Sequence, residues 1–257
     1  MRTPLAAIVS AAVAIASLAA QAPAPVARGS SVAPQPSAPI PRYEVKRASS
    51  PITIDGNLDE AAWAGASPAV TLQFLWDNQT GAKQATHARV VWDAQAFYIG
   101  FDADDADINA RFQNHDDPTY QDDAVEIFIN PDPKQEVVYY GFEMSVRGVL
   151  YDYLNYNSRT LFKRWDATGV KIATSVRGTM NDRTDTDKGW SLEAAIPWAN
   201  FEELSRRPPV AGAVWKANFN RWDGVQPARR MSIWSDPQNA EAWPHVPSRF
   251  GELVFVG

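Results

Sequence analysis

Short segments in which apolar and polar residues alternate constrain the fold of this chain more than any other feature of its sequence. In segment 97–101, Phe97, Ile99 and Phe101 alternate with Tyr98 and Gly100. The same spacing recurs in segments 125–129, 140–146, 190–196 and 215–219. Side chains two residues apart lie on the same face of a β-strand. Each segment is therefore predicted to be a strand with one buried face.

Turn-forming residues separate these segments, among them Gly148, Gly189 and Gly224. Short strands at this spacing predict an all-β fold, an antiparallel β-sandwich of two sheets with a jelly-roll or immunoglobulin-like arrangement. Helix signals are confined to segments 59–64 and 198–204. We expect one domain over residues 43–257, with a few short helices.

The first 42 residues differ in composition from the rest of the chain. Arg2 precedes an apolar run from Leu5 to Ala20, and small residues follow. This pattern is typical of a secretory signal peptide, predicted over residues 1–22, because the run is shorter than the ~20 residues that a membrane span needs. Residues 23–42 are rich in proline, alanine and serine and predict an extended linker. We expect export to a periplasm or the cell exterior, with no membrane span after cleavage.

Charge and residue usage exclude several classes of function. A net charge of −6 argues against nucleic acid as a partner, since phosphate binding relies on surplus lysine and arginine. The absence of cysteine excludes disulfides and thiolate metal sites. The chain has no nucleotide-binding glycine loop, and its three histidines, His87, His115 and His245, lack the HExxH spacing of a zinc protease.

An acidic stretch lies between two predicted strands. It contains Asp102, Asp104, Asp105 and Asp107. Alternating carboxylates in a loop suit calcium, which prefers oxygen ligands, although the EF-hand spacing is absent. The alternative is a solvated acidic surface at a strand end. We expect no required cofactor, and a structural calcium ion is the candidate ligand of this stretch.

Paired carboxylates also suggest glycoside hydrolysis, in which two acids flank a sugar bond. The candidates are Asp122, Asp123, Glu126 and Glu143. Their separation and pKa values are not readable from a sequence. Hydrolysis, or an accessory role beside a hydrolase, is therefore kept as an alternative to simple binding.

Tryptophan is abundant, with ten residues, and aromatic rings either fill a β-core or face a ligand. Strand periodicity predicts core positions for Trp63, Trp92, Trp190 and Trp215. Trp243 instead lies in a loop sequence, NAEAWPHVP, beside Asn239 and Glu241, and Tyr120 precedes a strand. The faces of a sugar ring stack on such aromatic rings, so Tyr120 and Trp243 are the candidate platforms.

Six segments, in order along the chain, resemble the family 9 carbohydrate-binding modules and the wider group of DOMON-like β-sandwiches. They are PITIDGNLDEAAW (51–63), ARVVWDAQAFYIGF (88–101), DDAVEIFIN (122–130), GWSLEAAIPW (189–198), WKANFNR (215–221) and HVPSRFGELVF (245–255). The resemblance covers nearly all of residues 51–256. It implies a β-sandwich that binds ends of plant polysaccharides or free sugars between two aromatic rings, often with structural calcium.

The resemblance also assigns site residues. Tyr120 and Trp243 match the two rings, Glu126 the carboxylate of the D-x-V-E strand, and Asn239 an amide in the second loop. Glu143 stands where sugar-binding relatives can carry an arginine, and it would accept hydroxyl protons rather than donate. With Arg221 as a further hydroxyl partner, the predicted sugar site comprises Tyr120, Glu126, Glu143, Arg221, Asn239 and Trp243.

DOMON-like relatives that bind haem provide a second alternative. Haem needs axial ligands facing an apolar slot, and Met144, His115 and His245 are available. Met144, however, shares its predicted strand face with Phe142 and Val146, which favours core packing. The sequence therefore predicts an exported, non-catalytic carbohydrate-binding protein that serves polysaccharide breakdown.

Overall fold

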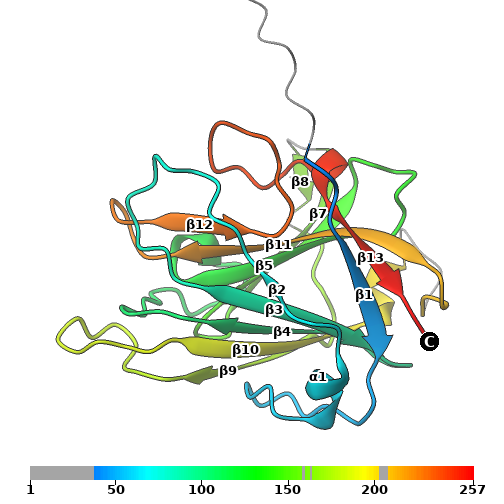
Figure 1. Ribbon diagram of the computed structural model, residues 1–257, viewed down its shortest axis with the longest axis horizontal. Helices are drawn as coiled ribbons and strands as arrows, with labels where there is room; N and C mark the ends of the chain where they lie inside the picture. Colours follow the sequence, from blue (N-terminus) through cyan, green and yellow to red (C-terminus); the bar gives the residue numbers. More distant parts are fainter. Residues whose placement is uncertain (1–37, 158–159, 163, 203–207) are drawn as a thin grey trace, which may run out of the picture. The chain divides into compact units, whose positions relative to one another are not determined.

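The computed structural model describes residues 38–157, 160–162, 164–202 and 208–257 (Figure 1). The predicted signal peptide, residues 1–22, and residues 23–37 of the predicted linker lie outside the described residues. The strands are β1 (Arg42–Arg47), β2 (Val70–Thr71), β3 (Thr86–Trp92), β4 (Ala96–Ala103), β5 (Ala124–Asn130), β6 (Tyr139–Ser145), β7 (Leu150–Asn157), β8 (Thr160–Phe162), β9 (Lys171–Val176), β10 (Trp190–Pro197), β11 (Val214–Asp223), β12 (Arg230–Ile233) and β13 (Gly251–Phe255).

The strands form one curled sheet in the order β8-β7-β6-β5-β11-β13-β1-β3-β4-β10-β9, with β12 beside β11 and β2 beside β3. The first four residues of β1, from Arg42 to Val45, run parallel to β13, whereas Lys46 and Arg47 run parallel to β3. The other paired strands are antiparallel. Figure 1 shows β1 between β13 and β3. Because β1 changes partners along its length, it joins the strands on the β13 side to those on the β3 side, and the two layers of the fold form one curled sheet. The fold therefore differs from the two separate antiparallel sheets that the sequence predicts.

The predicted strands and helix content are confirmed. Segment 97–101 lies in β4, and segments 125–129, 140–146, 190–196 and 215–219 lie in or at the end of β5, β6, β10 and β11. The helices are short: α1 (Ala61–Gly65) and the 3-10 turns η1 (Thr119–Gln121), η2 (Trp198–Phe201) and η3 (Pro247–Arg249). Helix α1 overlaps the predicted segment 59–64 and ends one residue beyond it. The turn η2 begins the other predicted segment, 198–204, whose last two residues lie outside the described part.

The main core fills the space between the two layers of the curled sheet. Its largest members are aromatic, and Trp92, Trp198 and Phe255 meet edge to face with ring centroids 5.6–6.3 Å apart. The predicted core positions of Trp63, Trp92, Trp190 and Trp215 are confirmed, since all four are buried. Among the described residues, no helix is long and apolar enough to cross a membrane.

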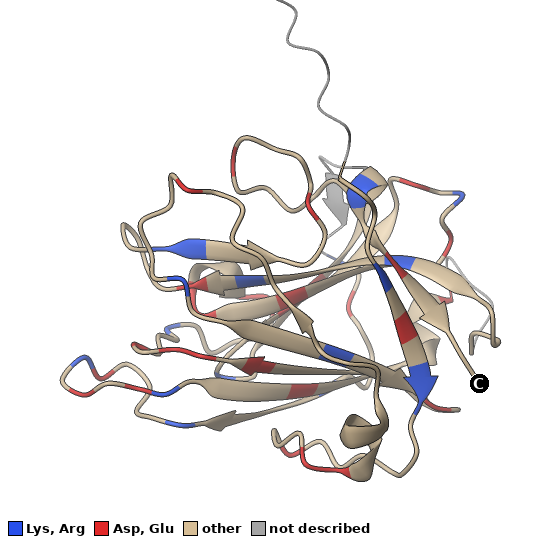
Figure 2. Cartoon of the chain, viewed as in Figure 1, with Lys and Arg blue, Asp and Glu red and all other residues tan. Residues whose placement is uncertain are grey.

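The outer face of β5, β6 and β7 is buried as well, under the loops before β5 and between β12 and β13. Phe128, Tyr139, Tyr153 and Phe250 form a second aromatic cluster there. Gly141 is required at its position, because a Cβ atom would lie 2.3 Å from the Tyr153 ring. This second buried layer is the base on which the candidate site stands. Figure 2 shows that acidic residues occur within these strands as well as in loops.

Candidate functional site

A row of polar and aromatic side chains crosses the outer face of four strands. In the strand register, Asn220 of β11 lies directly opposite Glu126 of β5. Glu126 lies opposite Glu143 of β6, and Glu143 lies opposite Tyr151 of β7. Residues directly opposite each other on neighbouring strands point to the same face of a sheet. Strand register therefore places two carboxylates side by side at the base of the site.

A cavity of about 280 Å³ opens above this row. It is lined by Tyr120, Glu126, Glu143, Tyr151, Trp222, Trp243, Pro244 and His245. Four of the predicted sugar-site residues, Tyr120, Glu126, Glu143 and Trp243, are thus brought together. Trp243 is 51% exposed, whereas Glu126 is only 2% exposed. The cavity therefore has an accessible aromatic wall above a buried acidic floor.

The walls of the cavity are braced by contacts with the second aromatic cluster. The Trp243 ring lies 4.5 Å from the ring of His245, which in turn stacks on Phe128 at 4.8 Å. His245 Nδ1 shares a 2.6 Å hydrogen bond with the Tyr139 hydroxyl. Burial lowers the pKa of His245 to about 4, so the ring is neutral at pH 7 and adds no positive charge to the site. Tyr120 packs edge to face on Tyr151, 5.8 Å away.

The Glu126 carboxyl group in the cavity floor has a raised pKa. Burial raises its pKa to about 7, and the Arg229 guanidinium with the Asn220 and Trp222 side chains offsets this only in part. Arg229 lies behind the cavity wall, 4.1 Å over the Trp222 ring, and lines a different cavity. At neutral pH, Glu126 is therefore divided between its acid and its carboxylate forms.

This raised pKa makes folding stability depend on pH. Between about pH 4.5 and 7, the folded chain holds a proton at Glu126 that the unfolded chain has released, so the free energy of unfolding falls as pH rises through this window. The fall from this one group is about 3 kcal/mol, since one pKa unit corresponds to about 1.4 kcal/mol. We expect Glu126→Gln to be more stable than the wild type at pH 8 and similar to it at pH 4.5.

Urea unfolding of both proteins across this pH range measures the difference, and it isolates Glu126 because the other titrating groups are shared. The exposed Glu44 provides a matched control, since Glu44→Gln should leave the pH dependence unchanged. A constant difference between Glu126→Gln and the wild type from pH 4.5 to 8 would contradict the prediction.

Arg221 is not part of the cavity, and its prediction as a hydroxyl partner is wrong. It follows Asn220 in β11, and successive side chains of a strand point to opposite faces. Arg221 is therefore fully buried on the inner side, where its Nη2 donates to Asp105 Oδ2 and Asp223 Oδ1, each at 2.9 Å. Its Nη1 donates to Thr86 Oγ1 at 2.9 Å and to the Asp104 carbonyl oxygen at 2.7 Å.

The acidic stretch predicted for calcium does not converge on one point. Asp102 pairs with Arg177 at 2.8 Å and Asp107 with Arg183 at 3.4 Å. Asp104 is exposed, and its carbonyl oxygen is the acceptor for Arg221. The four residues are separated because each follows the alternation of β4 or the turns after it.

Asp105 instead meets Asp123 and Asp223 in a buried cluster. Each carboxylate oxygen there already accepts a hydrogen bond, for example Asp123 Oδ1 from Gly224 N and Oδ2 from Asn109 N, both at 2.6 Å. Burial and the two neighbouring carboxylates raise the pKa of Asp123 well above its usual range. The Arg221 guanidinium already supplies the positive charge, so these residues do not fit a calcium ion.

Asn239 lies beside the cavity rather than in it. Its Nδ2 donates to the Trp243 carbonyl oxygen at 3.0 Å, and its own carbonyl oxygen accepts from Trp76 Nε1 at 3.0 Å. Asn239 thus shapes the loop that presents Trp243, and it lines an adjoining cavity with Trp243 and His245, so its role as a hydroxyl partner stays a prediction. Met144 points into the main core, on the opposite face of β6 from Glu143, as its periodicity predicts.

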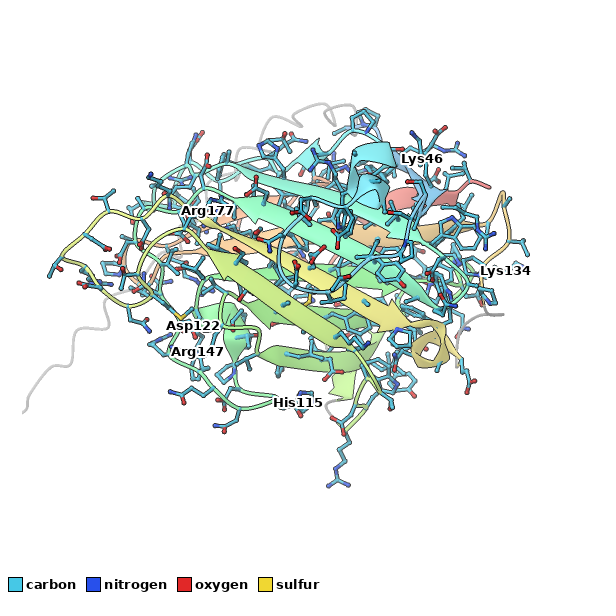
Figure 3. The ribbon with its side chains drawn as sticks, turned by 90° about the horizontal axis from the view of Figure 1, so that it is seen from below. Lys46, His115, Asp122, Lys134, Arg147 and Arg177 are labelled. Carbon is cyan, nitrogen blue, oxygen red and sulfur yellow. The ribbon has the colours of Figure 1, made fainter. Side chains whose placement is uncertain are left out.

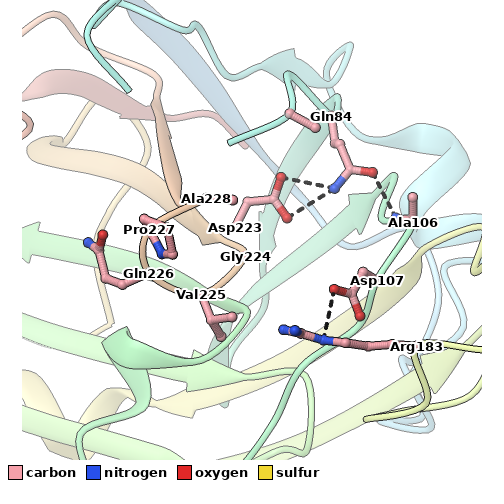
Figure 4. Close-up of a pocket in the computed structure, with 11 residues that line it drawn as sticks. Gln84, Ala106, Asp107, Arg183, Asp223, Gly224, Val225, Gln226, Pro227 and Ala228 are labelled. Carbon is pink, nitrogen blue, oxygen red and sulfur yellow. Dashed lines mark hydrogen bonds and ion pairs between the residues drawn. The ribbon is translucent and has the colours of Figure 1, made fainter. Parts of the chain in front are cut away.

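A second cavity, of about 310 Å³, lies beside the Gly224–Ala228 turn. Figure 4 shows Gln84 at its edge, with Nε2 donating to both carboxylate oxygens of Asp223 at 3.0–3.1 Å and Oε1 accepting from Ala106 N. No aromatic ring is among the described residues that line it. This cavity offers no platform for stacking, so we favour the cavity beneath Trp243 as the functional site.

A β-sheet domain with an aromatic wall above a floor of hydrogen-bond acceptors has the form of a carbohydrate-binding module. The chain belongs to the carbohydrate family 9 binding domain-like family, whose family model matches residues 54–257. This confirms the family that the sequence segments resemble. Comparison with curated proteins finds none that matches this chain.

Solved structures share the fold. A candidate carbohydrate-binding protein from Bacteroides uniformis ATCC 8492 superposes with a TM-score of 0.71 at 20% identity, covering 84% of this chain and 100% of that one. A family 9 module from Caldicellulosiruptor kristjanssonii, in complex with cellotriose, gives a TM-score of 0.60 at 19% identity, covering 84% and 94%. Its glucose complex gives the same TM-score and identity, covering 84% and 96%.

Proposed function

We propose that this chain is an exported, non-catalytic protein that binds sugars or polysaccharide chain ends in the cavity beneath Trp243. The observation that carries the proposal is that one cavity combines an exposed tryptophan, Trp243, with a buried acidic floor formed by Glu126 and Glu143. The structural relatives solved in complex with cellotriose and glucose support it, since they share the fold. The signal-peptide pattern of residues 1–22 supports export. A role in polysaccharide breakdown is part of the proposal.

The size of the cavity favours the end of a chain over its middle. At about 280 Å³ it lies near the lower bound of ligand sites, which is about 300 Å³. Tyr120 and Trp243 line it together, so a sugar ring that enters contacts aromatic carbon as well as the floor. Contacts between sugar and protein are direct in this proposal, and no bridging ion is required.

The floor determines which sugars bind. Glu126 and Glu143 are directly opposite each other on β5 and β6, and carboxylates accept hydrogen bonds from sugar hydroxyls. A sugar that carries its own carboxylate would bring a further negative charge to this acidic floor, which is unfavourable. We therefore propose neutral sugars, such as glucose or xylose units, as ligands.

Calorimetric titration at pH 7.5 with glucose, xylose and their trisaccharides tests this proposal. We expect heat of binding with neutral sugars and at least about tenfold weaker binding of glucuronic acid than of glucose, because like charges repel. The methyl ester of glucuronic acid is the matched control, since it keeps the shape and removes the charge. Failure of every neutral sugar to bind would refute the proposed function, and equal binding of the acid would refute the role of the floor.

Glycoside hydrolysis is the second candidate function, and the pKa of Glu126 near 7 is the observation that favours it, since a general acid needs a proton at neutral pH. The geometry favours binding instead. Glu126 and Glu143 project from adjacent strands of one sheet face, whereas a hydrolase places its two acids on either side of the scissile bond. Release of reducing sugar from a polysaccharide panel, abolished by Glu126→Gln, would decide for hydrolysis.

A further inference from the structure

The position of Asp152 breaks the pattern of its strand. In β7, Leu150, Asp152 and Leu154 share one face, and Asp152 lies opposite Phe142 of β6, a member of the main core. The Asp152 side chain is 0% exposed. Its Oδ2 accepts a hydrogen bond from Ala167 N at 2.6 Å, but Oδ1 is buried and has no hydrogen-bond donor. Buried charges in proteins are paired or coordinate metals, so this oxygen calls for a partner.

Three other side chains converge on that oxygen. His115 Nε2 lies 3.5 Å from Asp152 Oδ1, 3.4 Å from Asp166 Oδ1 and 3.7 Å from Asp116 Oδ1. The four ligand atoms all lie within 4.8 Å of one another. Within the described part of the chain, no lysine or arginine forms an ion pair with any of the three carboxylates. One imidazole thus faces three acids without another cation to balance them.

The three distances from His115 Nε2, 3.4–3.7 Å, are close to the ligand spacing around a small divalent metal ion. Tetrahedral zinc binds nitrogen and oxygen at about 2.0–2.2 Å, which separates neighbouring ligand atoms by about 3.3–3.6 Å. Imidazole suits zinc and other first-row transition ions, whereas calcium takes six to eight oxygens at about 2.3–2.6 Å. A set of one nitrogen and three oxygens therefore favours a zinc-like ion over calcium.

We propose that His115, Asp116, Asp152 and Asp166 form a binding site for a transition-metal dication of the zinc class. The site is separate from the sugar cavity, because Asp152 points to the opposite face of β7 from Tyr151 and Tyr153. An ion there would tie the loop before η1 to β7 and to the segment that follows residue 163. That loop leads to Tyr120, so the metal would brace one wall of the sugar cavity from behind.

The surroundings provide access and support for an ion. His115 and Asp116 are partly exposed, and His115 lines an open cavity with Arg147 and Leu150. Figure 3 shows His115 at the lower edge of the view, on the same side of the molecule as Arg147. Asp116 is held in place because its backbone N donates to the Leu150 carbonyl oxygen at 2.9 Å. Metal ligands need such support together with an entry path.

Calorimetric titration of zinc chloride into the untagged full chain, first stripped with a chelator, tests the proposal. We expect one zinc ion per chain, and a melting temperature higher by about 5 °C or more when zinc exceeds Kd 100-fold. His115→Gln should weaken zinc binding by at least about tenfold. His87→Gln is the matched control and should bind zinc like the wild type, since His87 lies on β3 and its Nδ1 shares a 2.9 Å hydrogen bond with Thr71 Oγ1 of β2.

Asp152→Asn separates a metal site from a purely structural ion pair. This variant should lose the zinc response while its melting temperature without metal stays equal or rises, because a buried charge has been removed. Absence of zinc binding by the wild type would overturn the proposal, as would equal losses in His115→Gln and His87→Gln. A calcium response that survives His115→Gln would also overturn it, since the carboxylates alone would then hold the ion.

Discussion

Trp243→Ala should weaken binding of neutral sugars by about 30-fold or more, which corresponds to the roughly 2 kcal/mol typical of a tryptophan that dominates a binding site. The ring is 51% exposed in the free protein and lines the cavity over Glu126 and Glu143. A bound sugar would cover this apolar surface. Because the ring is largely exposed before binding, the free energy of unfolding should change by less than about 1 kcal/mol.

Calorimetric titration with the tightest neutral trisaccharide measures this loss, and urea unfolding checks that the fold is intact. Tyr156 is a matched control, because it is also 51% exposed but does not line the cavity. Tyr156→Ala should bind as the wild type does. Trp243→Phe should retain part of the affinity, since a smaller ring still stacks. Unchanged binding by Trp243→Ala would place the sugar site elsewhere.

Arg221→Met should destabilise the domain by about 3–5 kcal/mol, the cost of leaving buried charge without its partner. The guanidinium is fully buried and pairs with Asp105 and Asp223, and a carboxylate oxygen of Asp123 lies within 4.8 Å of one from each of them. Removing it leaves three carboxylates in the protein interior. The loss should shrink at acidic pH, where the carboxylates are protonated, because burial already raises the pKa of Asp223 to about 6.

Urea unfolding at pH 8 and pH 5 measures this effect. Arg177→Met provides the control, since Arg177 pairs with Asp102 at the same kind of distance but at the surface, where ion pairs contribute less than about 1 kcal/mol. A loss below about 1 kcal/mol for Arg221→Met, or a loss that does not depend on pH, would show that the cluster does not depend on this cation.

The strands were predictable because alternation is a local property of the sequence. Segments such as Phe97–Phe101 and Trp215–Phe219 carry an apolar residue at every second position, and this spacing indicates a strand whatever its neighbours are. The predicted single buried face was wrong for Phe97–Phe101, because packing on the second side of β4 buries Tyr98 and Gly100 as well. The role of β1 was not predictable in this way. Its partners β13 and β3 are selected by contacts that are distant in sequence, and nothing within Arg42–Arg47 indicates that the strand pairs with both in parallel.

Site residues in loops were predictable from the sequence. Site residues in strands were less so, because their odd or even position along the strand sets which face of the sheet they point to. Trp243 and Tyr120 stand outside any strand period. Arg221, by contrast, continues the series Trp215, Ala217 and Phe219, so its buried position was already present in the spacing. The same parity places Asn220 beside Glu126.

Four cavity residues, Tyr151, Trp222, Pro244 and His245, are absent from the predicted sugar site. Trp222 is the one that parity alone could have found, two residues beyond Asn220. Tyr151 depends on the pairing of β6 with β7, and His245 on the path of the loop before β13. Both are set by tertiary contacts that a single sequence does not reveal.

The split pairing of β1 has a consequence for how the domain is made. Val45 is paired with Phe255, so one edge of the first strand, β1, is covered only when the last strand, β13, has formed. Such distant pairing slows folding, since a long loop must close first. The segment Arg42–Val45 therefore keeps an open strand edge until residues 251–255 pair with it. Substitutions in β13 should accordingly impair the yield of folded protein more than its final affinity for ligand.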